Sequence, residues 1–409
     1  MKLIKLFFLF VFIFPYYLYS STQALLKLRI FPQDYKVFIN NNEAKIIKYD
    51  SEDNIKYIKL NNGYHKIKIV SDNYVEKEFS LEINKDIFIE DKLEKKNSTL
   101  KLINIIRTGK QPKSVRFTPD GKFILIPLLD DNGIDIVDAQ KMSVIKRIIP
   151  LNLSSKKGFV ETAVLKKKNE FWVSQMTTGY IHVVDLSNFE MKKSIKTPGK
   201  YPKVIVFDRN ETKGFISNWL SKDITILDTE NYTVLKTIKA GGIPRGMVLS
   251  PDERYIYVAI FDKKQINKID IDSGKIVYSI KCDNSMRHLV PDYKNRVFYA
   301  SSMGSGKVFK ISFDNDKVLK ENYIAPKLNT IVLSEDGNFL YVSSRGRNGK
   351  KGYLLKGPEF GKVFVLKSST LEVVDWVWGK NQPTGLDVYN NMVVFSDFLD
   401  GEIEVYKNF

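Results

Sequence analysis

The residues of this chain that could bind a ligand recur at one position of a repeated segment. A proline or an apolar residue precedes a short apolar strand seven times: Pro112, Val160, Pro202, Pro244, Met286, Leu328 and Pro383. The residues that follow them are, in chain order, Lys113, Glu161, Lys203, Arg245, Arg287, Asn329 and Thr384. Four of the seven are basic, and His288 stands next to the fourth of these. If the repeats surround one axis, these cations form a ring that attracts an anion.

More cations lie in the longest insertion of the repeats, residues 345–361. They are Arg345, Arg347, Lys350, Lys351 and Lys356. The insertion joins the second and third strands of its repeat, so we expect it on the same face as the ring. The sequence therefore predicts one anion-binding face that includes Lys113, Lys203, Arg245, Arg287, His288, Arg345 and Arg347. The alternative is structural, with each cation paired to a carboxylate of a neighbouring repeat and the insertion a solvated loop.

Residues that could carry out catalysis are sparse. Glu161 and His288 could act as an acid–base pair if they lie within hydrogen-bonding distance in one channel. Cys282 is the single cysteine, which excludes an internal disulfide framework. The three histidines are far apart in the sequence, without the spacing of a metal site. We therefore expect no catalytic residue, no cofactor and no metal.

The elements that must position these residues repeat beyond residue 100. An apolar alternating strand begins at residues 134, 181, 224, 266, 308, 363 and 403, at intervals of 40 to 55 residues. Turns such as Thr118–Gly121 lead into a further buried strand, so each repeat supplies four strands. Seven such copies predict an all-β, seven-bladed β-propeller over residues 98–409. The last repeat ends after its third strand, and we expect residues 101–108 to close blade seven and remove the exposed edges.

Two of these repeats resemble a known family. The segments Ser250–Val258 (SPDERYIYV) and Ser334–Ser344 (SEDGNFLYVSS) are similar to the YVTN family of β-propeller repeats, although the Thr-Asn pair of that family is replaced here. The resemblance implies an extracytoplasmic propeller that serves as a binding or surface-layer module. It does not name a ligand, because propellers host many functions. Some propellers are lyases or lactonases, so a periplasmic enzyme of that type is the alternative function.

The N-terminal residues 1–24 have the pattern of a secretory signal peptide. Lys2 and Lys5 precede the apolar run Leu6–Phe14, and Thr22–Ala24 is the best cleavage site. The run is short for a spanning helix, so we expect membrane association only if the segment stays uncleaved as an anchor. The pattern places the mature protein in the periplasm or at the cell surface.

Residues 25–97 form a separate strand-rich unit. Period-two alternation predicts half-buried strands of a small antiparallel β-sandwich. The segments Lys36–Asn40 and Leu60–Ile69 resemble a PEGA domain, a small β-sandwich of bacterial envelope proteins, although the string that names that family is absent. The resemblance implies envelope attachment or spacing rather than catalysis.

The net charge of +17 comes from 64 basic and 47 acidic residues. Only 11 of the basic residues are arginine, the side chain preferred for bidentate contacts to phosphates and bases. That composition and the secretory segment argue against a nucleic-acid partner. The sequence predicts a non-catalytic binding or scaffold protein of the bacterial envelope, whose partner is an envelope protein or an anionic polymer.

Overall fold

The computed structural model describes residues 23–150, 157–350 and 352–408. These residues form 36 strands in nine four-stranded sheets, without a helix among them. The described residues therefore include no helix that is long and apolar enough to cross a membrane. Residues 1–22, most of the predicted signal segment, lie outside the described residues.

The N-terminal unit contains two sheets that share one hydrophobic core, which includes Leu26, Ile58 and Ile67. Strand β1 begins at Gln23 and Ala24 is buried in the core, so the strand starts before the end of the predicted cleavage site. Its pairing with β8 is parallel, which differs from the antiparallel arrangement expected from the sequence. The strands are β1 (Gln23–Phe31), β2 (Lys36–Ile39), β3 (Asn42–Glu43), β4 (Lys48–Asp50), β5 (Ile55–Asn61), β6 (Gly63–Val70), β7 (Lys77–Ile83) and β8 (Ile87–Lys92).

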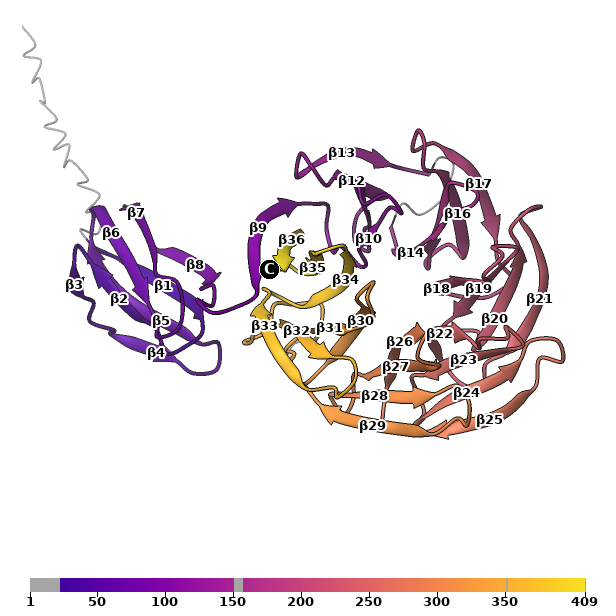
Figure 1. Cartoon of the computed structure of the whole chain (residues 1–409). Helices are drawn as coiled ribbons and strands as arrows, with labels where there is room; N and C mark the ends of the chain where they lie inside the picture. The colour runs from indigo at the N-terminus through magenta and orange to yellow at the C-terminus, as the bar shows by residue number, and fades with distance from the viewer. Residues whose placement is uncertain (1–22, 151–156, 351, 409) are drawn as a thin grey trace, which may run out of the picture.

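The other seven sheets follow one another around a ring, with the N-terminal unit beside it (Figure 1). The first three sheets contain β10 (Arg116–Phe117), β11 (Phe123–Pro127), β12 (Ile134–Asp138) and β13 (Ser143–Ile148); β14 (Phe159–Leu165), β15 (Glu170–Gln175), β16 (Tyr180–Asp185) and β17 (Met191–Lys196); and β18 (Pro202–Phe207), β19 (Lys213–Asn218), β20 (Asp223–Asp228) and β21 (Thr233–Lys239).

The next three sheets contain β22 (Pro244–Leu249), β23 (Tyr255–Ile260), β24 (Gln265–Asp270) and β25 (Ile276–Lys281); β26 (Met286–Asp292), β27 (Val297–Ser302), β28 (Lys307–Ser312) and β29 (Val318–Tyr323); and β30 (Leu328–Leu333), β31 (Phe339–Ser344), β32 (Lys362–Lys367) and β33 (Val373–Trp378). The last sheet combines β34 (Pro383–Tyr389), β35 (Met392–Asp397) and β36 (Glu402–Asn408) with β9 (Leu100–Arg107). Strand β9 therefore pairs with β36, which joins residues from the two ends of the ring.

Burial explains the order of strands in each sheet. The first strands of neighbouring sheets contact one another, as β22 and β26 do, and so lie at the centre of the ring. The second strands are almost wholly buried, whereas the fourth strands, such as β13, are mostly exposed. Apolar side chains from adjacent sheets fill the space between them, for example Phe215 and Ile256. These repeated four-stranded sheets are the architecture of a β-propeller, as the sequence predicted.

Candidate functional site

A cavity of about 240 Å³ lies among the beginnings of the central strands, and we call it the basic cavity. Lys203, Arg245 and Arg287 are each the second residue of a first strand, in β18, β22 and β26. Because repeated sheets place equivalent residues at the same radius, these side chains converge. The lining consists of Lys113, Leu129, Met176, Lys203, Trp219, Arg245, Phe261, Arg287, Met303, Lys327, Arg345, Asn348 and Tyr353.

The insertion 345–361 reaches the same cavity. It leaves the ring directly after β31 and contributes Arg345, Asn348 and Tyr353 to the lining. The Gln382 side-chain amide donates a hydrogen bond to the carbonyl oxygen of Tyr353 at 2.6 Å. The cations at the repeated position, Lys113, Lys203, Arg245 and Arg287, and the first cation of the insertion are therefore brought together in space.

Direct ion pairs to carboxylates are absent around five cations of the basic cavity in the part of the chain that the structure describes. Among the described residues, none of Lys113, Lys203, Arg245, Arg287 and Arg345 forms an ion pair. The Arg287 Nε instead donates to the side-chain oxygen of Asn329 at 2.5 Å. The Nε of Arg245, and the Nε and Nη2 of Arg345, are buried without a hydrogen-bond partner. Burying a charge without a counter-ion is costly, so an anion in the cavity would stabilise this arrangement.

Aromatic rings hold several of these cations. The Arg245 guanidinium lies 4.9 Å from the ring centres of both Trp219 and Phe261, and the Lys203 ammonium lies 4.9 Å from that of Trp219. The Lys113 ammonium lies 4.8 Å from the ring centre of Phe398. Such contacts compensate a desolvated cation only in part, and they leave its hydrogen-bond donors available to a ligand.

Burial changes the proton affinity of these groups. It lowers the pKa of Lys113 and of Lys203 well below their ordinary value, and the neighbouring arginines lower both further. Burial beside Arg287 also lowers the pKa of Arg345, to about 9. Each shift has the direction expected for a cation in an environment with an excess of positive charge. A bound anion would reverse these shifts.

Six apolar residues in the lining or, for Phe398, against its cations follow a repeat rule that the sequence-based prediction did not include. Leu129, Met176, Trp219, Phe261, Met303 and Phe398 stand five positions before residues 134, 181, 224, 266, 308 and 403, where the third-strand runs begin. We call these six residues the apolar collar. In the remaining repeat the insertion interrupts this spacing, and Arg345 takes the position directly after the second strand. The constant distance of these residues from the third-strand runs is a signal in the sequence that could have predicted the apolar collar. The signal is weak, because apolar residues are common near strand ends.

Two residues predicted for the site lie elsewhere. His288 lines a second cavity of about 200 Å³, together with Arg116 and Glu161. Neighbouring side chains along a strand point in different directions, so His288 does not follow Arg287 into the basic cavity. Arg347 is exposed, and its Nε lies 3.0 Å from a carboxylate oxygen of Glu359. The insertion therefore contributes Arg345 but not Arg347 to the basic cavity.

Glu161 and His288, the pair considered for acid–base chemistry, line the same cavity. No hydrogen bond joins them in the part of the chain that the structure describes. The Nδ1 atom of His288 lies 3.1 Å from the carbonyl oxygen of Ile331, and burial lowers the pKa of this histidine to about 3. Burial raises the pKa of Glu161, but Arg287 and Lys113 oppose the rise. Glu161 is thus a partial counter-ion for the cations of the basic cavity.

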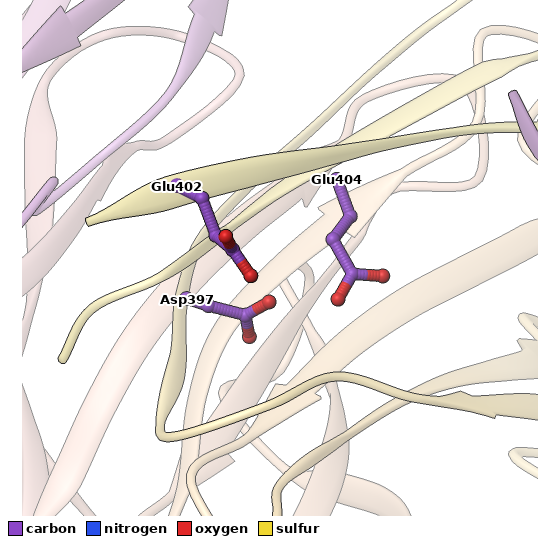
Figure 2. Close-up of side chains that lie close together, drawn as sticks. All are labelled: Asp397, Glu402 and Glu404. Carbon is purple, nitrogen blue, oxygen red and sulfur yellow. The ribbon is translucent and has the colours of Figure 1, made fainter. Parts of the chain in front are cut away.

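A cluster of buried carboxylates lies in the last sheet. Figure 2 shows Glu402 and Glu404 projecting from one strand toward Asp397. Burial and the neighbouring Glu404 raise the pKa of Asp397 well above its ordinary value. Glu402 lies 2.8 Å from both the Arg107 and Lys380 side chains.

The remaining cation of this cluster comes from the N-terminal unit. Lys92, at the end of β8, forms an ion pair with Glu404 and a hydrogen bond to the Tyr406 hydroxyl at 2.7 Å. Three cations thus pair with two of the three carboxylates, Glu402 and Glu404. We interpret the cluster as an ion network between the two units rather than as a metal site.

Comparison with known proteins relates the chain to one characterised sequence and one fold. No protein-family model matches the chain. It is 35% identical over 326 residues to Antigen Lp49 of Leptospira interrogans serogroup Icterohaemorrhagiae serovar copenhageni (strain Fiocruz L1-130), covering 77% of this chain and 71% of that protein. A solved chain of Kuenenia stuttgartiensis hydrazine synthase matches with a TM-score of 0.59 at 16% identity, covering 73% of this chain and 95% of that one. The second likeness supports the β-propeller fold alone. The first shows that this chain belongs to the family of Antigen Lp49.

Proposed function

We propose that this protein is a non-catalytic, extracytoplasmic protein of the bacterial envelope that binds an anionic ligand in the basic cavity. The observation that carries the proposal is the convergence of five cations on one cavity, three of them buried and two half-buried, none of which forms an ion pair among the described residues. Structural cations are normally paired when buried, because an unpaired buried charge destabilises the fold. A bound anion supplies the missing partner.

The proposed architecture is a seven-bladed, YVTN-like propeller preceded by a PEGA-like β-sandwich and a secretory signal segment. Seven four-stranded sheets around a ring and two N-terminal sheets on one core support it. The related protein is named an antigen, which supports a secreted or surface-exposed location. In this arrangement the propeller binds the ligand and the N-terminal unit connects it to the envelope.

Removing two cations of the ring tests the binding function. Each charge-assisted hydrogen bond contributes about 1.5–3 kcal/mol, so Arg245→Gln with Arg287→Gln should weaken anion binding by at least about tenfold. The matched control is Arg254→Gln with Arg296→Gln, which removes the same charge from two exposed arginines outside the cavity. Isothermal titration calorimetry with citrate, pyrophosphate and polyglutamate measures the affinity. Equal affinities of the two variants, or no binding by the unmodified protein, would contradict the proposal.

A further inference from the structure

We infer that the ligand of the basic cavity is a compact organic anion with at least two acidic groups. The inference rests on the proposed function and specifies its ligand. Six cations line the cavity, namely Lys327 and the five described above, and the carboxylate of Glu161 interacts with several of them. A ligand of one negative charge would leave most of this charge uncompensated. Two or three acidic groups on one molecule compensate a larger part of the excess.

The donors favour acidic groups that can accept two parallel hydrogen bonds. Arg245, Arg287 and Arg345 present guanidinium groups, which bind a carboxylate or phosphate through two parallel hydrogen bonds. Arg245 and Arg345 retain buried donor atoms without a partner. Because aromatic rings and Asn329 already position these side chains, little side-chain entropy is lost on binding.

The size and walls of the cavity exclude other anions. A volume of about 240 Å³ is smaller than the range of roughly 300–1,000 Å³ typical of drug-sized ligands. Tyr353 from the insertion lines one side, so that a polymer could insert only an end group. Leu129, Met176 and Met303 add apolar surface, which favours a ligand with a carbon skeleton over an inorganic anion.

Calorimetric titration with a graded set of anions tests this inference. Succinate, citrate and propanediol bisphosphate, each with at least two acidic groups, should bind at least about tenfold more tightly than acetate, because one additional charged hydrogen bond contributes about 1.5–3 kcal/mol. The carboxylates and the phosphate also distinguish the two kinds of acidic group. Met303→Ser should weaken citrate binding and leave pyrophosphate binding unchanged, since only citrate has a carbon skeleton.

The outcomes separate this inference from the proposed function. Binding of polyglutamate alone, or equal affinities for acetate and citrate, would overturn the inference and leave anion binding in place. Absence of binding by every anion would overturn both. An effect of Met303→Ser on pyrophosphate as large as on citrate would also contradict the role of the carbon skeleton.

A different set of contacts carries a second inference: we propose that the N-terminal unit positions the insertion 345–361 and thereby completes the basic cavity. The Asn54 side-chain amide donates to the carbonyl oxygen of Pro358 at 2.8 Å, and Arg29 donates to that of Gly357 at 3.1 Å. The aromatic rings of Phe31 and Phe360 stack at 4.5 Å between centres.

An ion pair reinforces these contacts. Lys356 of the insertion lies 2.6 Å from Glu90 in β8 and 2.5 Å from Asp400 of the last sheet. The insertion is thus held to both units at the same point. Ordering a long loop costs conformational entropy, and these interactions offset that cost. Because the same loop supplies Arg345 and Tyr353 to the cavity, its position determines the shape of the site.

Hydrogen–deuterium exchange measures this positioning without reference to a ligand. Asn54→Ala with Lys356→Ala removes three contacts, the Asn54 hydrogen bond and the two ion pairs of Lys356; at about 1 kcal/mol for a single contact, exchange in residues 345–361 should rise at least on the order of tenfold. Citrate affinity should fall in parallel. The matched control is Lys66→Ala with Glu78→Ala, which removes an exposed pair within the N-terminal unit.

The exchange pattern decides the outcome. Faster exchange confined to the insertion, with the strands of both units still protected, supports the positioning role. Unchanged exchange in the insertion overturns it, whatever the affinity. If exchange rises across both units, Phe31→Leu replaces the double variant, since it weakens the ring stacking and keeps an apolar side chain in the core.

Discussion

Lys92 connects the two structural units through a buried charge, and its removal should destabilise the protein strongly. The side chain extends from β8 into the last sheet, where it is 3% exposed and pairs with the fully buried Glu404. It also donates to the Tyr406 hydroxyl and to the carbonyl oxygen of Trp378. Burial alone would lower the pKa of Lys92, but the carboxylates of Glu404 and Glu94 outweigh burial and raise it.

The magnitude follows from what the substitution leaves behind. Lys92→Met keeps the length of the side chain and removes the charge, so Glu404 loses its cation beside Asp397 and Glu402. Breaking one partner of a buried ion pair costs about 3–5 kcal/mol, because the other charge stays buried without compensation. The other cations of the cluster, Arg107 and Lys380, pair with Glu402 and do not replace Lys92.

Urea denaturation at pH 7 measures this cost as a change in the free energy of unfolding. The control is Lys66→Met, whose pair with Glu78 at 2.8 Å is exposed and is worth only about 0–1 kcal/mol. Adding Glu404→Gln to Lys92→Met removes the stranded charge and should recover part of the stability. The reasoning is refuted if Lys92→Met costs no more than Lys66→Met, or if Glu404→Gln brings no recovery.

Three more predictions concern the carboxylate cluster, the basic cavity and the centre of the ring. The pKa of Asp397 is raised in the folded protein, so its contribution to stability is present below its ordinary pKa of 3.8 and is lost as the pH rises. Asp397→Asn should therefore gain stability relative to the unmodified protein between pH 4 and pH 8. Thermal melts that show the same difference in melting temperature at every pH would contradict this. Citrate affinity should fall as the pH rises from 7 to 10, because Lys113 and Lys203 lose their protons at lower pH than ordinary lysines. Calorimetry in buffers of different ionisation enthalpy should show proton uptake on citrate binding. An affinity that does not change with pH would argue against ligand contact with these lysines. Gly246→Ala would bring the added Cβ to 2.5 Å from the Leu289 backbone nitrogen, so overpacking should lower the free energy of unfolding by about 1–3 kcal/mol. The control Gly349→Ala meets nothing closer than 3.5 Å and should lower it less. Equal melting temperatures of the two variants would show that the first strands can move apart without cost.

Much of the candidate site could be predicted from the repeat. Lys203, Arg245 and Arg287 were found because each follows the same position of a repeated unit, and repeated sheets around an axis bring such positions to one radius. The apolar collar obeys an equally regular spacing, as Trp219 and Phe261 show. It was missed because an apolar residue near a strand end is ordinary, whereas a recurring cation is not.

The sequence by itself therefore determined the all-β propeller fold and the convergence of the cations, since both follow from local periodicity. Only the tertiary structure decided that His288 faces a second cavity, that Arg347 pairs with Glu359, and that Lys92 neutralises Glu404. Lys92 and Glu404 lie 312 positions apart, in units that do not repeat each other. Contacts of that kind depend on how distant segments pack, and no periodicity in the chain records them.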